Sequence, residues 1–295
     1  MSEIDEITEE VRLFFEYQAV FCEKLAEGTF VVADGSANPR ADLSNYVQSH
    51  VLACSSLAGL SFLWEVLEQP TYPFGGSDTE RFICFLHSLT SNPNFARVCT
   101  PFLYYALDKK SAAKPDGVER YFRSDLFEKW VRRDNDYVQH VVSRDPLQQE
   151  VRDLYEECEH NNPALPDAET LRNPDHALFT FTYAGLIYKL YRNAFAHTYH
   201  PSQQTTQFGR PGEEMRVIQQ SGYTLITEVS GELITTTRQS VDELGNATIR
   251  ALLDIPITIL TAAVREGASI VAQLIVRERY LPYGYDKDVE VRTKA

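Results

Sequence analysis

The sequence lacks several patterns that would place the chain in a familiar class. Its 295 residues include only 14 glycines and 14 prolines, a smaller share than average, which excludes collagen-like and low-complexity chains. None of the five cysteines forms a C-x-x-C pair, so neither a disulfide framework nor a thiolate zinc site is predicted. Phosphate-binding glycine loops (G-x-x-x-x-G-K-[ST] and G-x-G-x-x-G) and the G-x-S-x-G nucleophile elbow are also missing.

Positive charge is scarce. The chain has 28 Lys and Arg against 42 Asp and Glu, a net charge of −14, which disfavours non-specific coating of nucleic acid or anionic membranes. The first six residues (MSEIDE) are acidic, unlike a signal peptide. The apolar stretch 251–276 carries Asp254, Arg265 and Glu266, so it does not read as a membrane span. We expect a cytoplasmic protein without a membrane segment.

Apolar residues recur at helical spacing over most of the chain, which predicts a mainly α protein. The expected helices cover residues 2–26, 42–69, 79–89, 94–109, 118–142, 146–160, 175–200 with Asp175 as N-cap, and 240 or 242 to 281 with an interruption near Pro256. Before the last helix, three Thr- and Val/Ile-rich segments are separated by Ser-Gly pairs and predict a short antiparallel β hairpin or meander: 215–220, 223–229 and 233–238. We divide the chain into an N-terminal helical region, 1–160, and a second region, 161–295, packed as one compact unit.

The most informative segment is 191–201, YRNAFAHTYHP, which contains R-N-x-x-x-H and R-x4-H-x-Y. Arg192 offers a planar fork that binds a phosphate through two hydrogen bonds. His197 can exchange a proton near neutral pH, Asn193 can orient the imidazole or the substrate, and Tyr199 is an auxiliary candidate. These groups supply what metal-independent cleavage of RNA requires: a base, an acid and stabilisation of charge on phosphorus.

The spacing of these residues constrains how they can meet. Asn193 and His197 are four residues apart and share one helix face. Arg192 and His197 are five apart, about 140° around a regular helix. Either the helix is distorted before Pro201, or two copies of the chain contribute residues to one site across a two-fold interface.

The motif resembles the active-site motif of the HEPN superfamily, helical proteins common among toxins and antiviral ribonucleases. The resemblance covers about 167–260 and implies a HEPN-like helical bundle and a homodimer with facing motif helices. It also implies RNA products with a 2′,3′-cyclic phosphate and a 5′-hydroxyl. Tyr199 matches the variant of HepT toxins, whose equivalent tyrosine is adenylylated by a partner nucleotidyltransferase, although this chain is about twice as long as such toxins. An antitoxin or another defence-system partner is therefore expected.

A second basic stretch interleaves cations with aromatic residues, and it predicts either an auxiliary RNA contact or a solvated helix face; its cations are Arg120, Arg123, Lys129, Arg132 and Arg133. Two other Arg–His pairs have a similar spacing, Arg81 with His87 and Arg133 with His140. The first of these spans the apolar run 82–86 and is expected to lie in a buried helix rather than in a second active site.

Two other functions remain open. His197 and His200 could bind a metal with Asp175 or Glu213, which would make the chain a metal-dependent hydrolase, but we expect no metal and no cofactor. The other alternative is a non-catalytic helical module that uses the same helix to dimerise. The favoured hypothesis is a homodimeric, metal-independent endoribonuclease of a toxin–antitoxin or antiviral defence system.

Overall fold

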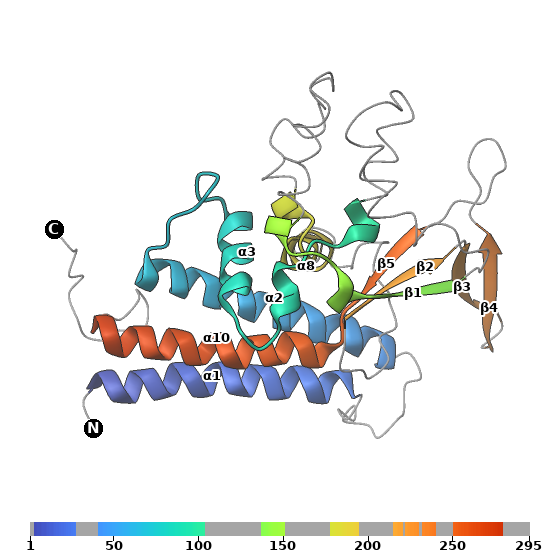
Figure 1. The fold of residues 1–295 in the computed structure, drawn as a ribbon. Helices are drawn as coiled ribbons and strands as arrows, with labels where there is room; N and C mark the ends of the chain where they lie inside the picture. Colours follow the sequence, from blue (N-terminus) through green and yellow to red (C-terminus); the bar gives the residue numbers. More distant parts are fainter. Residues whose placement is uncertain are drawn as a thin grey trace, which may run out of the picture.

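Three long helices form the base of the molecule in a computed structural model (Figure 1). The structure describes residues 3–27, 41–103, 137–150, 178–194, 215–220, 222–229, 232–239 and 250–279. In this part of the chain helices predominate, which confirms the prediction of a mainly α protein. The strands lie beyond one end of the long helices (Figure 1).

The base consists of α1 (Glu3–Ala26), α2 (Ala41–Glu68) and α10 (Ile257–Glu278). The helices α1 and α10 lie side by side in opposite directions, and both pack against α2 (Figure 1). On α1 the buried side chains Val11, Phe15, Ala19 and Cys22 recur every three or four residues, so they form one stripe facing the other two helices. Burial of this stripe, rather than helix propensity alone, fixes α1 in place.

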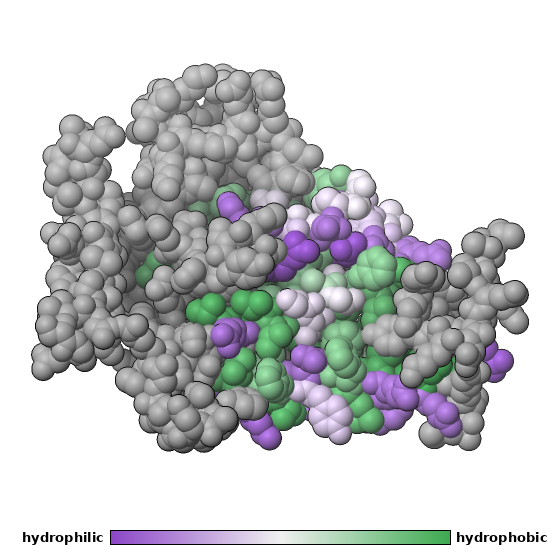
Figure 2. Space-filling model, turned by 180° about the vertical axis from the view of Figure 1, so that it is seen from behind, coloured by the Kyte–Doolittle hydropathy of each residue, from purple (hydrophilic) through white to green (hydrophobic). Residues whose placement is uncertain are grey.

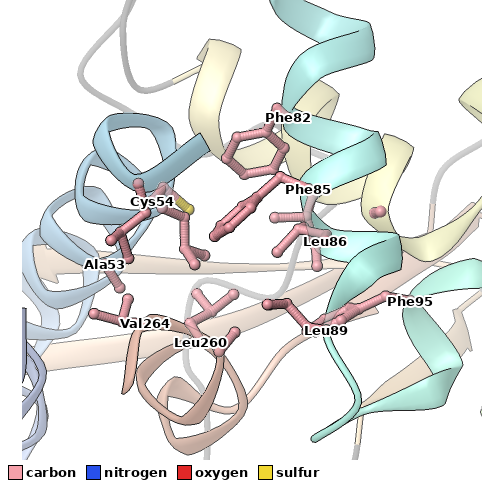
Figure 3. Close-up of a cluster of buried hydrophobic side chains, with 14 of the residues drawn as sticks. Ala53, Cys54, Phe82, Phe85, Leu86, Leu89, Phe95, Leu260 and Val264 are labelled. Atoms are coloured by element: carbon pink, nitrogen blue, oxygen red, sulfur yellow. The ribbon is translucent and has the colours of Figure 1, made fainter. Parts of the chain in front are cut away.

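A shorter helix, α3 (Asp78–Ser88), covers this base. The side chain of Ser77 caps it by accepting a hydrogen bond from the Glu80 backbone N–H. Phe82, Phe85 and Leu86 of α3 point into a core shared with α2 and α10, where Leu260 and Val264 meet them (Figure 3). The ring of Phe85 also lies against Gly267 of α10, so a glycine is needed for this close approach.

Short elements follow α3. They are η1 (Pro93–Ala96), β1 (Tyr137–Val141), η2 (Val142–Arg144), α8 (Tyr183–Ile187) and the π-helical turn η4 (Tyr188–Arg192). Isolated bridges join Arg97 to Leu147 and Val98 to Thr182. These contacts hold the start of α8 beside η1 and η2, so residues far apart in the chain surround the segment that leads to the motif.

The strands form two separate ladders. In the first, β2 (Arg216–Gln220) lies between β1 and β5 (Arg250–Asp254), antiparallel to both. In the second, β3 (Gly222–Val229) pairs with β4 (Glu232–Gln239), with Gly222 opposite Gln239 and Val229 opposite Glu232.

Several expected elements are wrong. The three consecutive strands do not form one meander, because β2 pairs with β1 and β5 instead of β3. Residues 137–141 are a strand rather than the end of a helix, and 250–254 are a strand rather than the start of the last helix, which begins only after Pro256. In each case the pairing partner is at least 30 residues away in sequence, so local apolar periodicity could not reveal it.

Two helices are long and apolar enough to span a membrane by length and composition, 46–68 and 257–278. About half of each apolar window is buried inside the fold, 50% and 56% respectively. Core helices of water-soluble proteins have the same character, so these helices carry no argument for a membrane.

Candidate functional site

The segment that carries Arg192 starts from a firmly anchored end. Thr182 caps α8 by accepting a hydrogen bond from the Gly185 backbone N–H at 3.2 Å. The adjacent Tyr183 is fully buried and donates its hydroxyl to Oδ2 of Asp145 at 2.6 Å. Thr100 donates to the other oxygen of that carboxylate, also at 2.6 Å. Burial raises the pKa of Tyr183 well above its usual value, so the phenol remains a hydrogen-bond donor at neutral pH.

The helix widens directly before the motif. Residues Tyr188–Arg192 form a π-helical turn in which the Asn193 backbone N–H donates to the carbonyl of Tyr188. A π turn contains an extra residue relative to an α turn, and such turns are frequent at functional sites. The widening rotates Arg192 and Asn193 relative to the buried α8. Among the described residues, this π turn distorts the helix directly before Arg192; His197 lies outside the described residues, so the expected distortion between the two motif residues stays a prediction.

Tyr191 holds this turn against the core. Its side chain is buried, its hydroxyl donates to the carbonyl of Leu253 in β5 at 3.1 Å, and its ring stacks on the imidazole of His50 with centroids 5.6 Å apart. His50 is itself enclosed, with Nε2 2.8 Å from the Ile255 carbonyl and Nδ1 2.9 Å from the Tyr46 carbonyl. Burial lowers the pKa of His50. We therefore assign it a structural role in joining α2 to the end of β5.

Arg192 is half-buried and follows this anchor directly. Its guanidinium carbon lies 5.1 Å from the centre of the Tyr188 ring, and its Nη1 donates to the Tyr188 hydroxyl at 3.3 Å. In the part of the chain that the structure describes, no carboxylate forms an ion pair with Arg192. An aromatic ring beside an arginine orients the guanidinium without neutralising its charge.

The structure describes two of the four predicted catalytic residues, Arg192 and Asn193. Asn193 follows Arg192 directly and is half-buried. His197 and Tyr199 lie outside the described residues, as do the metal candidates His200, Asp175 and Glu213 and the five cations of the second basic stretch, Arg120, Arg123, Lys129, Arg132 and Arg133. Within the described ranges, no group of three or more His, Cys, Asp or Glu is placed to hold a metal ion.

The Arg–His pair on α3 has a different environment. Arg81 pairs with Glu65 at 3.0 Å and with Asp78 at 2.9 Å, so carboxylates already compensate its charge. His87 is half-buried with Nε2 3.3 Å from Oγ1 of Thr182, and burial lowers its pKa to about 4. A neutral imidazole and a neutralised guanidinium do not form an anion site, which supports the expectation of a buried helix here.

Sequence reasoning missed two residues that determine the geometry of Arg192. Tyr188 precedes Arg192 by four residues, a spacing that puts side chains in contact on a helix, so this signal was available. Asp145 anchors the start of α8 from 38 residues away. A lone aspartate in a polar stretch gives no indication of such a contact.

Comparisons with known proteins assign no family: no family model matches the chain, and neither a curated protein nor a solved structure is significantly similar to it.

Proposed function

We propose that the chain is a metal-independent endoribonuclease of the HEPN type that acts as a homodimer in a toxin or antiviral defence role. The observation that carries this proposal is the state of Arg192: half-buried, supported by Tyr188, and without a carboxylate partner among the described residues. Arg81 of α3, which belongs to an Arg–His pair of similar spacing, has two such partners. Among the described residues, Arg192 is thus the arginine of the two whose charge no carboxylate compensates.

In the proposed reaction, Arg192 binds the scissile phosphate with its fork and stabilises the charge that develops on phosphorus. His197 removes the proton from the ribose 2′-hydroxyl or supplies one to the leaving 5′-oxygen, and the copy in the facing subunit takes the other step. Asn193 orients substrate or imidazole, and Tyr199 assists. The bond from phosphorus to the 5′-oxygen breaks as the bond to the 2′-oxygen forms, which leaves a 2′,3′-cyclic phosphate and a 5′-hydroxyl.

The fold fits this proposal at a coarse level. A HEPN-like helical bundle with a β insertion after the motif helix would have the helices α1, α2 and α10 as its base and β2 to β5 as the insertion. The expected setting is the cytoplasm, with RNA as substrate and an antitoxin or other defence component as partner.

Labelled RNA incubated with the full chain in the presence of EDTA tests the proposal. We expect cleavage that EDTA does not stop, with cyclic-phosphate ends. Arg192→Ala should reduce the rate by at least about 100-fold, the usual effect of removing one donor that stabilises a transition state. Arg192→Lys should recover little of the lost cleavage rate, because lysine keeps the positive charge but lacks the planar guanidinium that forms two hydrogen bonds to a phosphate. His197→Ala should also abolish cleavage.

Arg277→Ala is the matched control, because it removes a surface arginine of α10 that pairs with Glu68 and Glu278. Its cleavage rate should equal that of the wild type. RNA that remains intact with the wild-type chain would favour the non-catalytic module, cleavage that stops with EDTA would favour a metal-dependent hydrolase, and cleavage that survives Arg192→Ala would remove Arg192 from the mechanism.

A further inference from the structure

Two cations share the outward side of the π turn that leads to the motif. Tyr188 is half-buried and Lys189 is exposed, and the two side chains after them are buried. Arg192 and Asn193, one turn later, are half-buried again. The positions that face outward thus recur once per turn of the widened helix, which puts Lys189 and Arg192 on the same side. We call Tyr188, Lys189, Arg192 and Asn193 the outward strip.

Each cation of the outward strip lies beside an aromatic ring. Nζ of Lys189 is 6.0 Å from the centre of the Phe181 ring, just as the guanidinium of Arg192 is beside the ring of Tyr188. Among the residues that the structure describes, no carboxylate forms an ion pair with either cation. An aromatic face attracts a cation without neutralising it, so both side chains keep their charge.

The core fixes both of these rings. The ring of Tyr188 packs against Phe82 of α3, which is buried, with the ring centres 5.5 Å apart. Phe181 packs against the hydrophobic core, and its carbonyl accepts a hydrogen bond from the Cys99 backbone N–H at 2.9 Å. The two cations are therefore presented beside rings whose places are set by the fold.

The arginines of the three-helix base are arranged differently. Each of them pairs with at least one glutamate: Arg12 with Glu9, Arg265 with Glu16 and Glu23, and Arg277 with Glu68 and Glu278. Seen from behind, the described surface carries hydrophilic side chains scattered among hydrophobic ones (Figure 2). In a chain with a net charge of −14, two neighbouring cations whose charge no described carboxylate compensates create a local site for an anion.

We propose that Lys189 binds the phosphate next to the one that Arg192 binds, so that the outward strip contacts two successive phosphates of a single-stranded RNA. This contact rests on the proposed ribonuclease and adds a substrate-binding residue to it. Residues three apart on a helix surface have Cβ atoms about 5–6 Å apart, a spacing that suits neighbouring phosphates of one strand. Cations beside aromatic rings are typical of sites for single-stranded nucleic acid.

The two cations have different tasks in this arrangement. Arg192 provides a planar fork for the phosphate that reacts, whereas Lys189 provides a flexible point charge that any oxygen of the neighbouring phosphate satisfies. The neighbouring phosphate does not change during the reaction, so its contact with Lys189 is equally strong in the bound substrate and in the transition state. Such a contact lowers KM and leaves kcat unchanged.

Fluorescence anisotropy with a labelled single-stranded RNA tests the contact without cleavage, if 2′-O-methyl groups block the attacking oxygen. We expect Lys189→Ala in the full chain to weaken binding by about 5-fold or more at low salt, the loss of a hydrogen bond to a charged group. The slope of log Kd against log salt concentration should fall by about 0.7, the value for one phosphate contact to a single strand. Lys189→Gln, which keeps most of the side chain, should show the same loss, and Lys189→Arg should keep the slope.

Arg277→Ala is the matched control, because it also removes an exposed cation, but one that pairs with Glu68 and Glu278. Its affinity and its slope should equal those of the wild type. Lys189 is exposed, so its variants should fold, which circular dichroism checks. With cleavable RNA, Lys189→Ala should raise KM by about the same factor as Kd and leave kcat unchanged, whereas Arg192→Ala should lower kcat.

The outcomes separate this contact from the ribonuclease itself. An unchanged affinity and slope in Lys189→Ala, or an equal loss in Arg277→Ala, would overturn the contact and leave the ribonuclease standing. A loss of kcat at unchanged KM in Lys189→Ala would also overturn it, because Lys189 would then act on the reacting phosphate. Binding that depends on Lys189, together with cleavable RNA that stays intact, would support the contact and refute the ribonuclease. A wild type that binds no single-stranded RNA would refute both.

Discussion

The three-helix base and the segment before the motif are held by different forces. The base helices contain 24, 28 and 22 residues and pack through continuous apolar stripes. The motif segment has only five residues in α8 and five in η4. It is fixed by hydroxyl groups that reach Asp145 and the carbonyl of Leu253.

This difference shows that a long helix can be held by its repeated apolar contacts, whereas a short segment depends on individual hydrogen bonds. A helix of more than 20 residues repeats its buried face several times, so the loss of one contact leaves many others. A segment of ten residues with a widened turn has few repeats, and its direction depends on single hydrogen bonds. A site that needs an arginine in a defined orientation gains precision from such anchors, at the cost of greater sensitivity to substitution.

Two glycines test this comparison most directly. An alanine Cβ at Gly185 of α8 would lie 2.5 Å from the carbonyl oxygen of Thr180, whereas at Gly267 of α10 it would lie 2.6 Å from the tip of the Phe85 ring. Backbone yields less than a side chain, so we expect Gly185→Ala to lower the free energy of unfolding by about 3 kcal/mol and Gly267→Ala by about 1 to 2 kcal/mol. Urea denaturation of both variants measures the difference. The comparison fails if Gly267→Ala is the more destabilised of the two.

The two tyrosine anchors should differ in strength. Tyr183→Phe removes the donor at 2.6 Å from the buried Asp145 carboxylate, and Tyr191→Phe removes the donor at 3.1 Å from a neutral carbonyl. Hydrogen bonds to charged groups contribute more, so we expect losses of about 2 kcal/mol and about 1 kcal/mol. Thermal and urea unfolding measure both, and equal losses would argue that Asp145 is not a charged acceptor. Arg192 itself is unchanged in both variants, so any change in RNA cleavage reports on its orientation.

The sequence predicts α1, α2 and α3 well, the start of α10 less well, and the motif segment poorly. The ends of α1, α2 and α3 fall within one residue of the expected helices, because apolar periodicity and turn residues are local signals. The long helix expected to start at Asp175 is instead interrupted at Phe181 and Thr182, and Thr182 caps α8. The bridge from Val98 to Thr182 and the bond to Asp145 impose this interruption from distant parts of the chain.

In the candidate site, too, local features could be predicted from the sequence and features that depend on distant residues could not. Arg192 and Asn193 could be selected from the motif because residue type and spacing carry that information. The contact with Tyr188 follows from a four-residue spacing, but the π turn does not, since no residue in YKLYR marks it. The strands β1 and β5 were missed for a related reason, because β2, which pairs with both, is distant in sequence.

The smallest expected effect lies in the base, where charges contribute beside an apolar core. Arg265 of α10 binds Glu23 of α1 at 2.6 and 2.8 Å and Glu16 at 2.9 Å. The hydrogen bonds from Arg265, with a further one from Thr261, hold the pKa of Glu23 below its ordinary value of 4.5 although partial burial opposes this. A lowered pKa in the folded state stabilises the fold above the unfolded value and is lost as the pH falls through the folded one.

Arg265→Met should therefore be less stable than the wild type at neutral pH, and the difference should shrink as the pH falls below 4.5. Urea unfolding at about pH 7 and about pH 3.5 brackets this window. Arg12→Met removes the exposed pair with Glu9 on the same helix and should match the wild type at both values, because solvent screens such pairs. A difference for Arg265→Met that does not vary with pH would attribute its effect to lost packing of the arginine stem rather than to charge, and the base would then depend on apolar contacts alone.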